Sequence, residues 1–163
     1  MTEPARNAAR DDIPTLRRIL QAHRVVAVVG LSAEWHRPSF FVAKYLQQHG
    51  YRILPVNPRY AGGHILGEPV HASLLDIEVP VDMVDVFRRT EDVLPFAEQA
   101  IQIGAHALWQ QIGVVNAEAD ALVRAAGLDS VMNRCVKIEH ARIFGGLHWA
   151  GVNTGVISAR RAV

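Results

Sequence analysis

A glycine that ends a short apolar run, followed by a serine and an arginine, is the feature of this chain best suited to holding an anion. The apolar residues 25–29 precede Gly30 and Ser32, and Arg37 follows, directly ahead of Pro38. Glycine lets the backbone turn sharply or approach a ligand closely, and proline suits the first turn of a helix. The free N–H groups and the dipole of such a helix start attract anions. The pattern therefore predicts a phosphate-bearing ligand at this loop.

Two interpretations of Gly30 are open. In the first, only a small residue lets the backbone approach a phosphate, so alanine at position 30 leaves the protein folded, at a loss of about 1 kcal/mol, and weakens ligand binding far more. In the second, Gly30 is a turn residue with positive φ, and its replacement affects stability alone.

The elements that must position this loop follow from hydrophobic periodicity. The expected strands are residues 25–29, 51–56, 83–87, 106–109 and 128–132, and the expected helices are residues 12–21, 38–50, 93–104, 117–126 and 135–142. Residues 58–80 are expected to form a long connection with at most one helical turn, near residues 73–76. Because strands alternate with helices, the predicted fold class is α/β, a doubly wound parallel sheet of about five strands with helices on both faces. Ligands of such sheets bind beyond the carboxyl ends of the strands.

The residues of these loops limit the classes of nucleotide that the site could bind. The dinucleotide fingerprint requires three spaced glycines and an acid after the second strand, whereas this loop has Gly30 alone and the second strand is followed by Asn57, Pro58 and Arg59. Ordinary NAD sites are therefore disfavoured, and a P-loop is excluded because Gly-Lys-Ser/Thr is missing. Arg59 could meet a phosphate on a ribose, which leaves NADP, with its 2′-phosphate, or coenzyme A, with its 3′-phosphate.

Several motifs in their order along the chain resemble the stand-alone CoA-binding protein family, which is similar to the N-terminal CoA-binding domain of the succinyl-CoA synthetase alpha subunit. The resemblance runs from about residue 24 to residue 142. Its motifs are Gly30-Leu31-Ser32, Arg37-Pro38-Ser39, Val56-Asn57-Pro58, Val84-Asp85-Val86-Phe87-Arg88, Trp109-x-Gln111-x-Gly113-Val114 and Lys137-x-Glu139-His140. One departure is Asn133 ahead of Arg134 and Cys135, where the family usually has Asp-Arg-Cys.

The resemblance implies a Rossmann-like fold with CoA at the strand ends, and it does not imply a reaction. We expect a single CoA-binding domain over residues 1–163, with flexible ends at roughly 1–10 and 145–163. The first hypothesis for its function is a module that binds coenzyme A or an acyl-CoA and has no chemistry of its own. The alternatives are an NADP-dependent oxidoreductase and a regulatory nucleotide-binding protein. The strand ends and the family motifs together predict these ligand-binding residues: Gly30, Leu31, Ser32, Arg37, Pro38, Ser39, Val56, Asn57, Pro58, Arg59, Phe87, Arg88, Arg89, Gln111 and Gly113.

Some of these residues also have a plainer interpretation. The Ser32 hydroxyl could donate to a phosphate or only satisfy the loop backbone, and Arg37 could bind phosphate or be a solvated surface residue. Asn57 and Pro58 could form the wall of an adenine pocket or only a turn. Of the two arginines after the third strand, one could reach the ligand while the other faces water.

Three other groups invite a chemical interpretation. Cys135 follows Arg134, which could lower the pKa of its thiol, although a buried structural cysteine is the commoner case. Lys137, Glu139 and His140 could be an acid–base group, or surface and packing residues of a short helix. The eight histidines show no metal-binding spacing. We therefore expect no metal site and no catalytic residue.

Composition limits the partners. The chain has 163 residues and a formal net charge of +1, and half of its residues are hydrophobic. Such a balance provides no field for nucleic acid or an anionic membrane, so we expect a small-molecule ligand and neither of those partners. One cysteine fits a reducing compartment, and the polar N-terminus lacks a signal-peptide pattern. The expected location is the cytoplasm.

Overall fold

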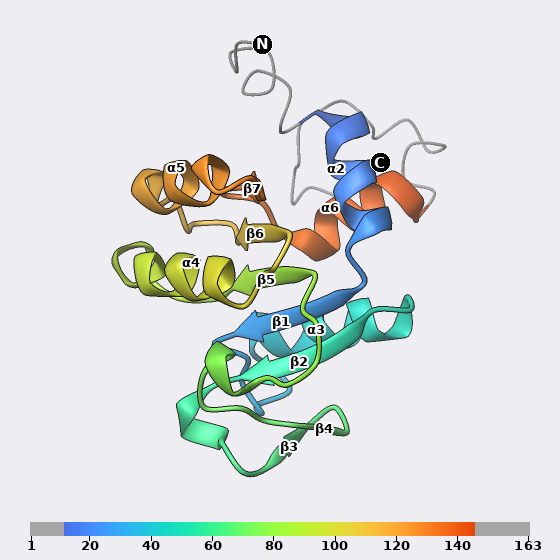
Figure 1. Ribbon diagram of the computed structural model, residues 1–163. Coiled ribbons are helices and arrows are strands. Elements are labelled where there is room, and N and C mark those ends of the chain that lie inside the picture. The colour runs from blue at the N-terminus through green and yellow to red at the C-terminus, as the bar shows by residue number, and fades with distance from the viewer. Residues whose placement is uncertain (1–11, 146–163) are drawn as a thin grey trace.

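A computed structural model describes residues 12–145 of the chain, and the ends predicted to be flexible lie outside that range apart from residue 145. Its centre is a five-stranded parallel sheet in the order β2-β1-β5-β6-β7 (Figure 1). The strands are β1 (Val25–Val29), β2 (Arg52–Val56), β5 (Met83–Val86), β6 (Ala107–Gln110) and β7 (Asp129–Val131). The direction of winding reverses between β1 and β5, as in doubly wound sheets of order 2-1-3-4-5. The predicted Rossmann-like α/β class is confirmed.

Helices cover both faces of the sheet (Figure 1). One face carries α4 (Val93–Gln102) and α5 (Ala117–Ala125), and the other carries α2 (Ile13–Ala22), α3 (Pro38–Gln48) and α6 (Val136–Phe144). All five predicted helices are present, with ends within a few residues of the prediction. None of the helices in the described range is long and apolar enough to cross a membrane.

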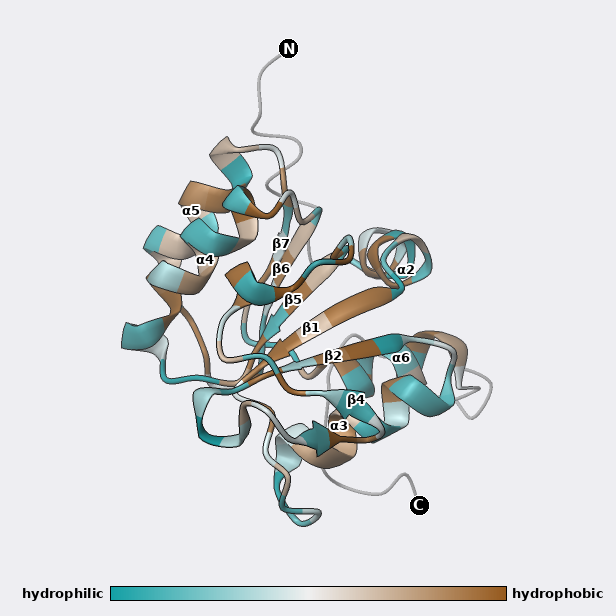
Figure 2. Ribbon diagram, turned by 60° about the horizontal axis from the view of Figure 1, so that its bottom comes forward, coloured by the Kyte–Doolittle hydropathy of each residue, from teal (hydrophilic) through white to brown (hydrophobic). Residues whose placement is uncertain are grey.

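The sheet is buried on both faces because its strands are apolar runs, as parallel sheets require. Val26 and Val28 pack toward α2, α3 and α6, whereas Ala27 and Val29 pack toward α4 and α5. Figure 2 shows the strands predominantly brown and the outer helices with teal segments. The buried strands hold the loops at their carboxyl ends in fixed relative positions.

Local capping explains where the helices begin. The Asp12 side chain accepts from the Thr15 N–H at 2.9 Å, and the Asn116 side chain accepts from the Ala119 N–H at 2.9 Å. Pro38 occupies the first turn of α3, where its missing N–H costs nothing. These caps confirm the predicted helix starts.

The connection after β2 is more structured than predicted. The expected turn is present as η2 (Leu74–Asp76), but the segment also contains η1 (Pro58–Tyr60) and a hairpin of β3 (His64–Ile65) with β4 (Glu68–Pro69). Strands of two residues are too short to show a period of two in the sequence, so they were missed. The hairpin returns to the sheet where the His71 N–H donates to the Pro55 carbonyl at 2.9 Å.

Candidate functional site

A cavity of about 1010 Å³ lies at the carboxyl ends of β1, β2, β5 and β6, where ligands of doubly wound sheets bind. Its walls are the loops after these strands, the first turns of α3 and the start of α6. Its lining residues are Gly30, Ser32, Glu34, Arg37, Pro38, Ser39, Phe41, Val42, Asn57, Pro58, Arg59, Tyr60, Phe87, Arg88, Arg89, Asp92, Gln111, Ile112, Val114 and Cys135. The volume is at the upper end of the range of about 300–1,000 Å³ typical of ligand sites.

Most of the predicted ligand-binding residues line this cavity, and three do not. Leu31 and Val56 are buried in the core, at 0% and 1% exposure, on either side of the sheet. Gly113 lies next to the lining, where its N–H donates to Asn133 Oδ1 at 2.8 Å. These three residues do not line the cavity themselves, but residues next to them in the sequence do.

The position of Gly30 is explained by the fold itself. Its φ is +84°, and a Cβ at this position would lie 2.3 Å from the Phe87 carbonyl oxygen. Gly30 directly follows β1 and Phe87 directly follows β5. The segments after these two neighbouring strands therefore separate here, at the switch point of the sheet. The positive φ confirms that Gly30 is a turn residue. The close approach to the Phe87 carbonyl indicates that Gly30→Ala loses more than about 1 kcal/mol of stability. That the backbone approaches a phosphate here remains a prediction.

Hydrogen bonds within the loops keep the floor of the cavity in place. Ser39 Oγ accepts from the Ser32 N–H at 3.0 Å, and Ser32 Oγ accepts from the Glu34 N–H at 3.0 Å. Asn57 links the two loops, because its Nδ2 donates to the Leu31 carbonyl at 3.0 Å. The Ser32 hydroxyl thus satisfies loop backbone, while its own O–H is still available to donate.

Four arginines line the cavity, and they differ in their partners. Arg37 donates to Glu34 and Arg89 donates to Asp92, each at 2.9 Å and both largely exposed. The pKa of the Glu34 carboxyl lies below its ordinary value, chiefly because Arg37 donates to it, with a smaller contribution from nearby Arg59.

Arg88 differs from the other arginines. Its Nε is buried and has no hydrogen-bond partner among the described residues. Its side chain also packs against the glycine turn, with Cδ 3.5 Å from where a Cβ on Gly30 would stand. A buried donor without a partner in a folded protein calls for an explanation, such as a ligand atom.

A buried polar pair formed by Asp85 and Gln111 lies beside the cavity, and of the two only Gln111 lines it. Asp85 is fully buried on β5, and its Oδ1 accepts from Gln111 Nε2 at 2.7 Å, while Oδ2 has no partner among residues 12–145. Burial raises the pKa of Asp85 to about 7, although the Gln111 hydrogen bond opposes the shift. Cys135 is buried, as predicted, and burial raises the pKa of its thiol, to which the charge of Asp85 adds.

None of the three predicted acid–base residues of α6 lines the cavity, and Glu139 and His140 are buried rather than at the surface. Lys137 Nζ lies 5.3 Å from the ring centroid of Phe41, which does line the cavity. Glu139 pairs with Arg142, and His140 Nδ1 contacts the Tyr45 hydroxyl at 2.9 Å. Burial lowers the pKa of His140 to about 4. We conclude that both residues stabilise the packing of α6 against its neighbours.

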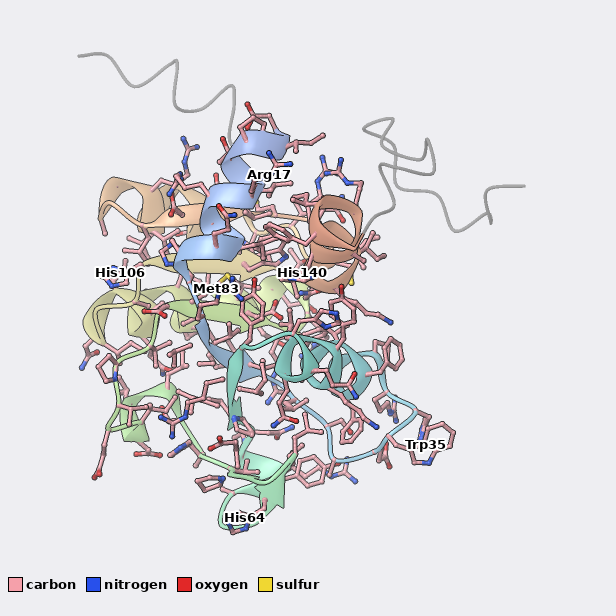
Figure 3. All side chains as sticks on the ribbon, turned by 90° about the vertical axis from the view of Figure 1, so that its right-hand side faces the viewer. Arg17, Trp35, His64, Met83, His106 and His140 are labelled. Carbon is pink, nitrogen blue, oxygen red and sulfur yellow. The ribbon has the colours of Figure 1, made fainter. Side chains whose placement is uncertain are left out.

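Sequence reasoning missed eight lining residues: Glu34, Phe41, Val42, Tyr60, Asp92, Ile112, Val114 and Cys135. Ile112 and Val114 lie inside a recognised motif, and Glu34, Phe41 and Tyr60 lie two residues beyond other motifs, so spacing alone could have included these five. Trp35 follows Glu34 but is 77% exposed and projects away from the body of the protein (Figure 3). A loop position therefore does not by itself place a side chain in the cavity.

The departure at Asn133 also has a structural explanation. Asn133 has φ of +59°, a conformation that asparagine and aspartate tolerate better than most residues. Its Oδ1 accepts from the Gly113 N–H, a bond that an aspartate oxygen could make equally well. The amide therefore preserves the support of the loop after β6.

The sequence pattern described as the CoA binding domain matches residues 24–141. The chain belongs to this family. The chain is 40% identical over 126 residues to the uncharacterized protein YneT of Bacillus subtilis (strain 168). The match covers 77% of this chain and 92% of YneT. The solved structure of cell-free ID.343 from Thermus thermophilus is 36% identical with a TM-score of 0.78, covering 82% of this chain and 99% of that one.

A more distant likeness concerns the fold alone. The dinucleotide forming acetyl-coenzyme A synthetase 1 of Ca. Korarchaeum cryptofilum is 17% identical with a TM-score of 0.56. The match covers 66% of this chain and 25% of the synthetase chain. A domain of this architecture is therefore also part of a larger enzyme.

Proposed function

We propose that this protein binds coenzyme A or an acyl-CoA in the cavity at the carboxyl edge of the sheet. The observation that carries the proposal is the unpartnered, buried Nε of Arg88 beside the Gly30 turn. A phosphate oxygen would accept from this donor. The N-terminus of α3, with Arg37 and Ser39 in the lining, adds further donors and a favourable dipole.

We further propose that the protein acts as a binding module and not as an enzyme. The two carboxylates in the lining, Glu34 and Asp92, are each paired with an arginine, so neither is poised as a base. The thiol of Cys135 has a raised pKa and is a poor nucleophile in that state. The competing candidate is an NADP-dependent enzyme, since the same arginines suit a ribose phosphate.

Calorimetric titration with CoA, NADP and NADH tests the proposal. We expect CoA to bind, and CoA at about 100 times its Kd to add about 2.7 kcal/mol to the free energy of unfolding. We expect Arg88→Met, which keeps the apolar stem, to weaken CoA binding at least ten-fold, because a charge-assisted hydrogen bond contributes about 1.5–3 kcal/mol. Arg17→Met is the matched control, since Arg17 is exposed on α2 (Figure 3).

Binding of NADP without binding of CoA would favour the oxidoreductase. Equal CoA affinities of wild type and Arg88→Met would contradict the role of Arg88. Absence of binding to any of these ligands at millimolar concentration would reject the proposal itself.

A separate prediction concerns the 3′-phosphate of CoA. Arg59 follows β2 at the place where NAD-binding sheets carry an acid. We expect CoA to bind about ten-fold more tightly than dephospho-CoA, in line with one charge-assisted bond. In Arg59→Met this difference should disappear, because only the CoA affinity falls. A difference that persists in the variant would assign the 3′-phosphate to another cation.

A further inference from the structure

The cavity is charged at one end and uncharged at the other. All six of its charged lining residues come from the loops after β1, β2 and β5: Glu34, Arg37, Arg59, Arg88, Arg89 and Asp92. The lining contributed after β6 and at the start of α6 consists of Gln111, Ile112, Val114 and Cys135. A ligand with its phosphates at the arginines therefore extends its other end toward β6 and α6.

The uncharged end carries several apolar side chains. Val42 on α3 and Cys135 at the start of α6 belong to the same core cluster, and the Asn133 N–H donates to the Val114 carbonyl at 3.2 Å. Phe41 and Ile112 also line the cavity and are 43% and 61% exposed. Large apolar side chains left open at the mouth of a cavity favour a ligand with an apolar group.

Gln111 supplies a polar side chain at this end. Its hydrogen bond with Asp85 determines the orientation of its amide group. Gln111 Nε2 donates to Asp85 Oδ1 at 2.7 Å, and Gln111 Oε1 has no hydrogen-bond partner among the residues described. Asp85 is fully buried, yet no arginine, lysine or histidine of the described structure pairs with it. A buried carboxyl without a cation reduces stability, and such groups are concentrated at functional sites.

We propose that this end of the cavity receives the acyl-thioester group of an acyl-CoA. Gln111 is the residue that binds the thioester carbonyl, and Asp85 is the positioning residue behind it. The acyl chain lies against Phe41, Ile112 and Val114. This inference rests on the proposed binding of CoA, and it adds the class of ligand and the residues that distinguish a thioester from a free thiol.

The orientation of the Gln111 amide decides what it can bind. An ionised Asp85 accepts from one of the two N–H groups of Nε2, which turns the amide so that Oε1, an acceptor, lies on the opposite side. A protonated Asp85 donates to Oε1, which leaves Nε2, a donor, for the carbonyl oxygen of a thioester. Since the pKa of Asp85 is raised to about 7 by burial, the donor orientation prevails below neutral pH.

The neighbours of Asp85 described below either do not titrate or have a raised pKa, so Asp85 is the group expected to titrate here. Its neighbours in the sheet are Val28 on β1 and Trp109 on β6, which do not titrate. The loop after β6 contributes the neutral Gln111, and α6 contributes the thiol of Cys135, whose pKa is raised by burial. A pH profile near neutrality in this part of the cavity therefore reports on Asp85.

The experiment compares three ligands by calorimetry at pH 6 and pH 8: CoA, butyryl-CoA and S-butyl-CoA, a thioether of the same length that lacks the carbonyl. For the wild type we expect butyryl-CoA to bind about five-fold more tightly than S-butyl-CoA at pH 6, the value of one hydrogen bond. At pH 8 this ratio should fall to about one.

The variants separate the roles of the residues. In Asp85→Asn residue 85 cannot ionise, so the ratio of the two affinities should be the same at pH 6 and pH 8. In Gln111→Met the ratio should be about one at both pH values. Gln99→Met, a glutamine on α4 outside the lining, is the matched control and should behave as wild type.

Ile112→Ser should weaken both butyl ligands about four-fold more than it weakens CoA, since roughly one CH₂ group loses its apolar contact.

Equal binding of butyryl-CoA and S-butyl-CoA to the wild type at both pH values would overturn the assignment of Gln111. A five-fold ratio retained in Gln111→Met would do the same. If CoA binds normally in these cases, the proposed function survives and only the thioester inference is lost. If none of the three ligands binds, the proposed function itself fails.

Discussion

Replacement of Gly30 by alanine is expected to lower the free energy of unfolding by about 3 kcal/mol or more. A non-glycine residue at positive φ costs of order 1–3 kcal/mol, and the added Cβ would stand 2.3 Å from the Phe87 carbonyl oxygen. Because that oxygen belongs to the backbone at the end of β5, relief requires moving the chain at the switch point. Urea denaturation at constant pH measures the loss.

Gly113→Ala provides the matched control. Gly113 has φ of +83°, nearly the same as Gly30, but a Cβ there would meet nothing within 4 Å. The control should therefore lose only the conformational part, about 1 kcal/mol. Similar losses of unfolding free energy in the two variants would show that the backbone at the end of β5 moves at little energetic cost. The close approach of the two loops would then not require glycine.

The second large effect is expected for Asp85→Asn, and it depends on pH. The pKa of Asp85 is raised from 3.8 to about 7 by burial, so between these values the folded protein keeps a proton that the unfolded chain releases. Stability from this group is fully present below about pH 4 and is lost as the pH rises to 7. Asparagine cannot titrate, so the variant should become progressively more stable than wild type over this interval, by up to roughly 4 kcal/mol above pH 7.

The measurement is urea denaturation of both proteins at intervals between pH 4 and pH 8. Asp76→Asn, an exposed aspartate on η2, is the control and should follow the wild-type curve. A constant difference between Asp85→Asn and wild type across the series would mean that Asp85 is ionised in the folded protein throughout. The switch in Gln111 orientation would then have no basis.

The secondary structure was predictable because it depends on local chemistry. Residues 25–29 form a strand buried on both faces, and their unbroken apolar run states this directly. Asp12 and Asn116 mark helix starts through hydrogen bonds that span only three residues, and Pro38 marks one because its ring suits the first turn. The lining contributed by the loop after β1 was likewise predictable, since Gly30, Ser32 and Arg37 lie within one short segment. The hairpin after η1 was not predictable, because its two-residue strands are held mainly by contacts with the end of β2.

Only the tertiary structure decided which of the candidate residues meet in one cavity and what each does there. Arg88 and Gln111 are 23 positions apart in the sequence, and parallel pairing of β5 with β6 brings the loops that carry them to the same edge. The burial of Asp85, which raises its pKa, comes from β1, β6 and α6 packing around it. The clash that excludes a side chain at Gly30 comes from Phe87, 57 residues away. The five strands of the main sheet, the five helices and the family were predictable from the sequence, because local periodicity and short motifs encode them. The charge and burial of individual side chains depend on segments far apart in the chain, and those distances are set only when the sheet has formed.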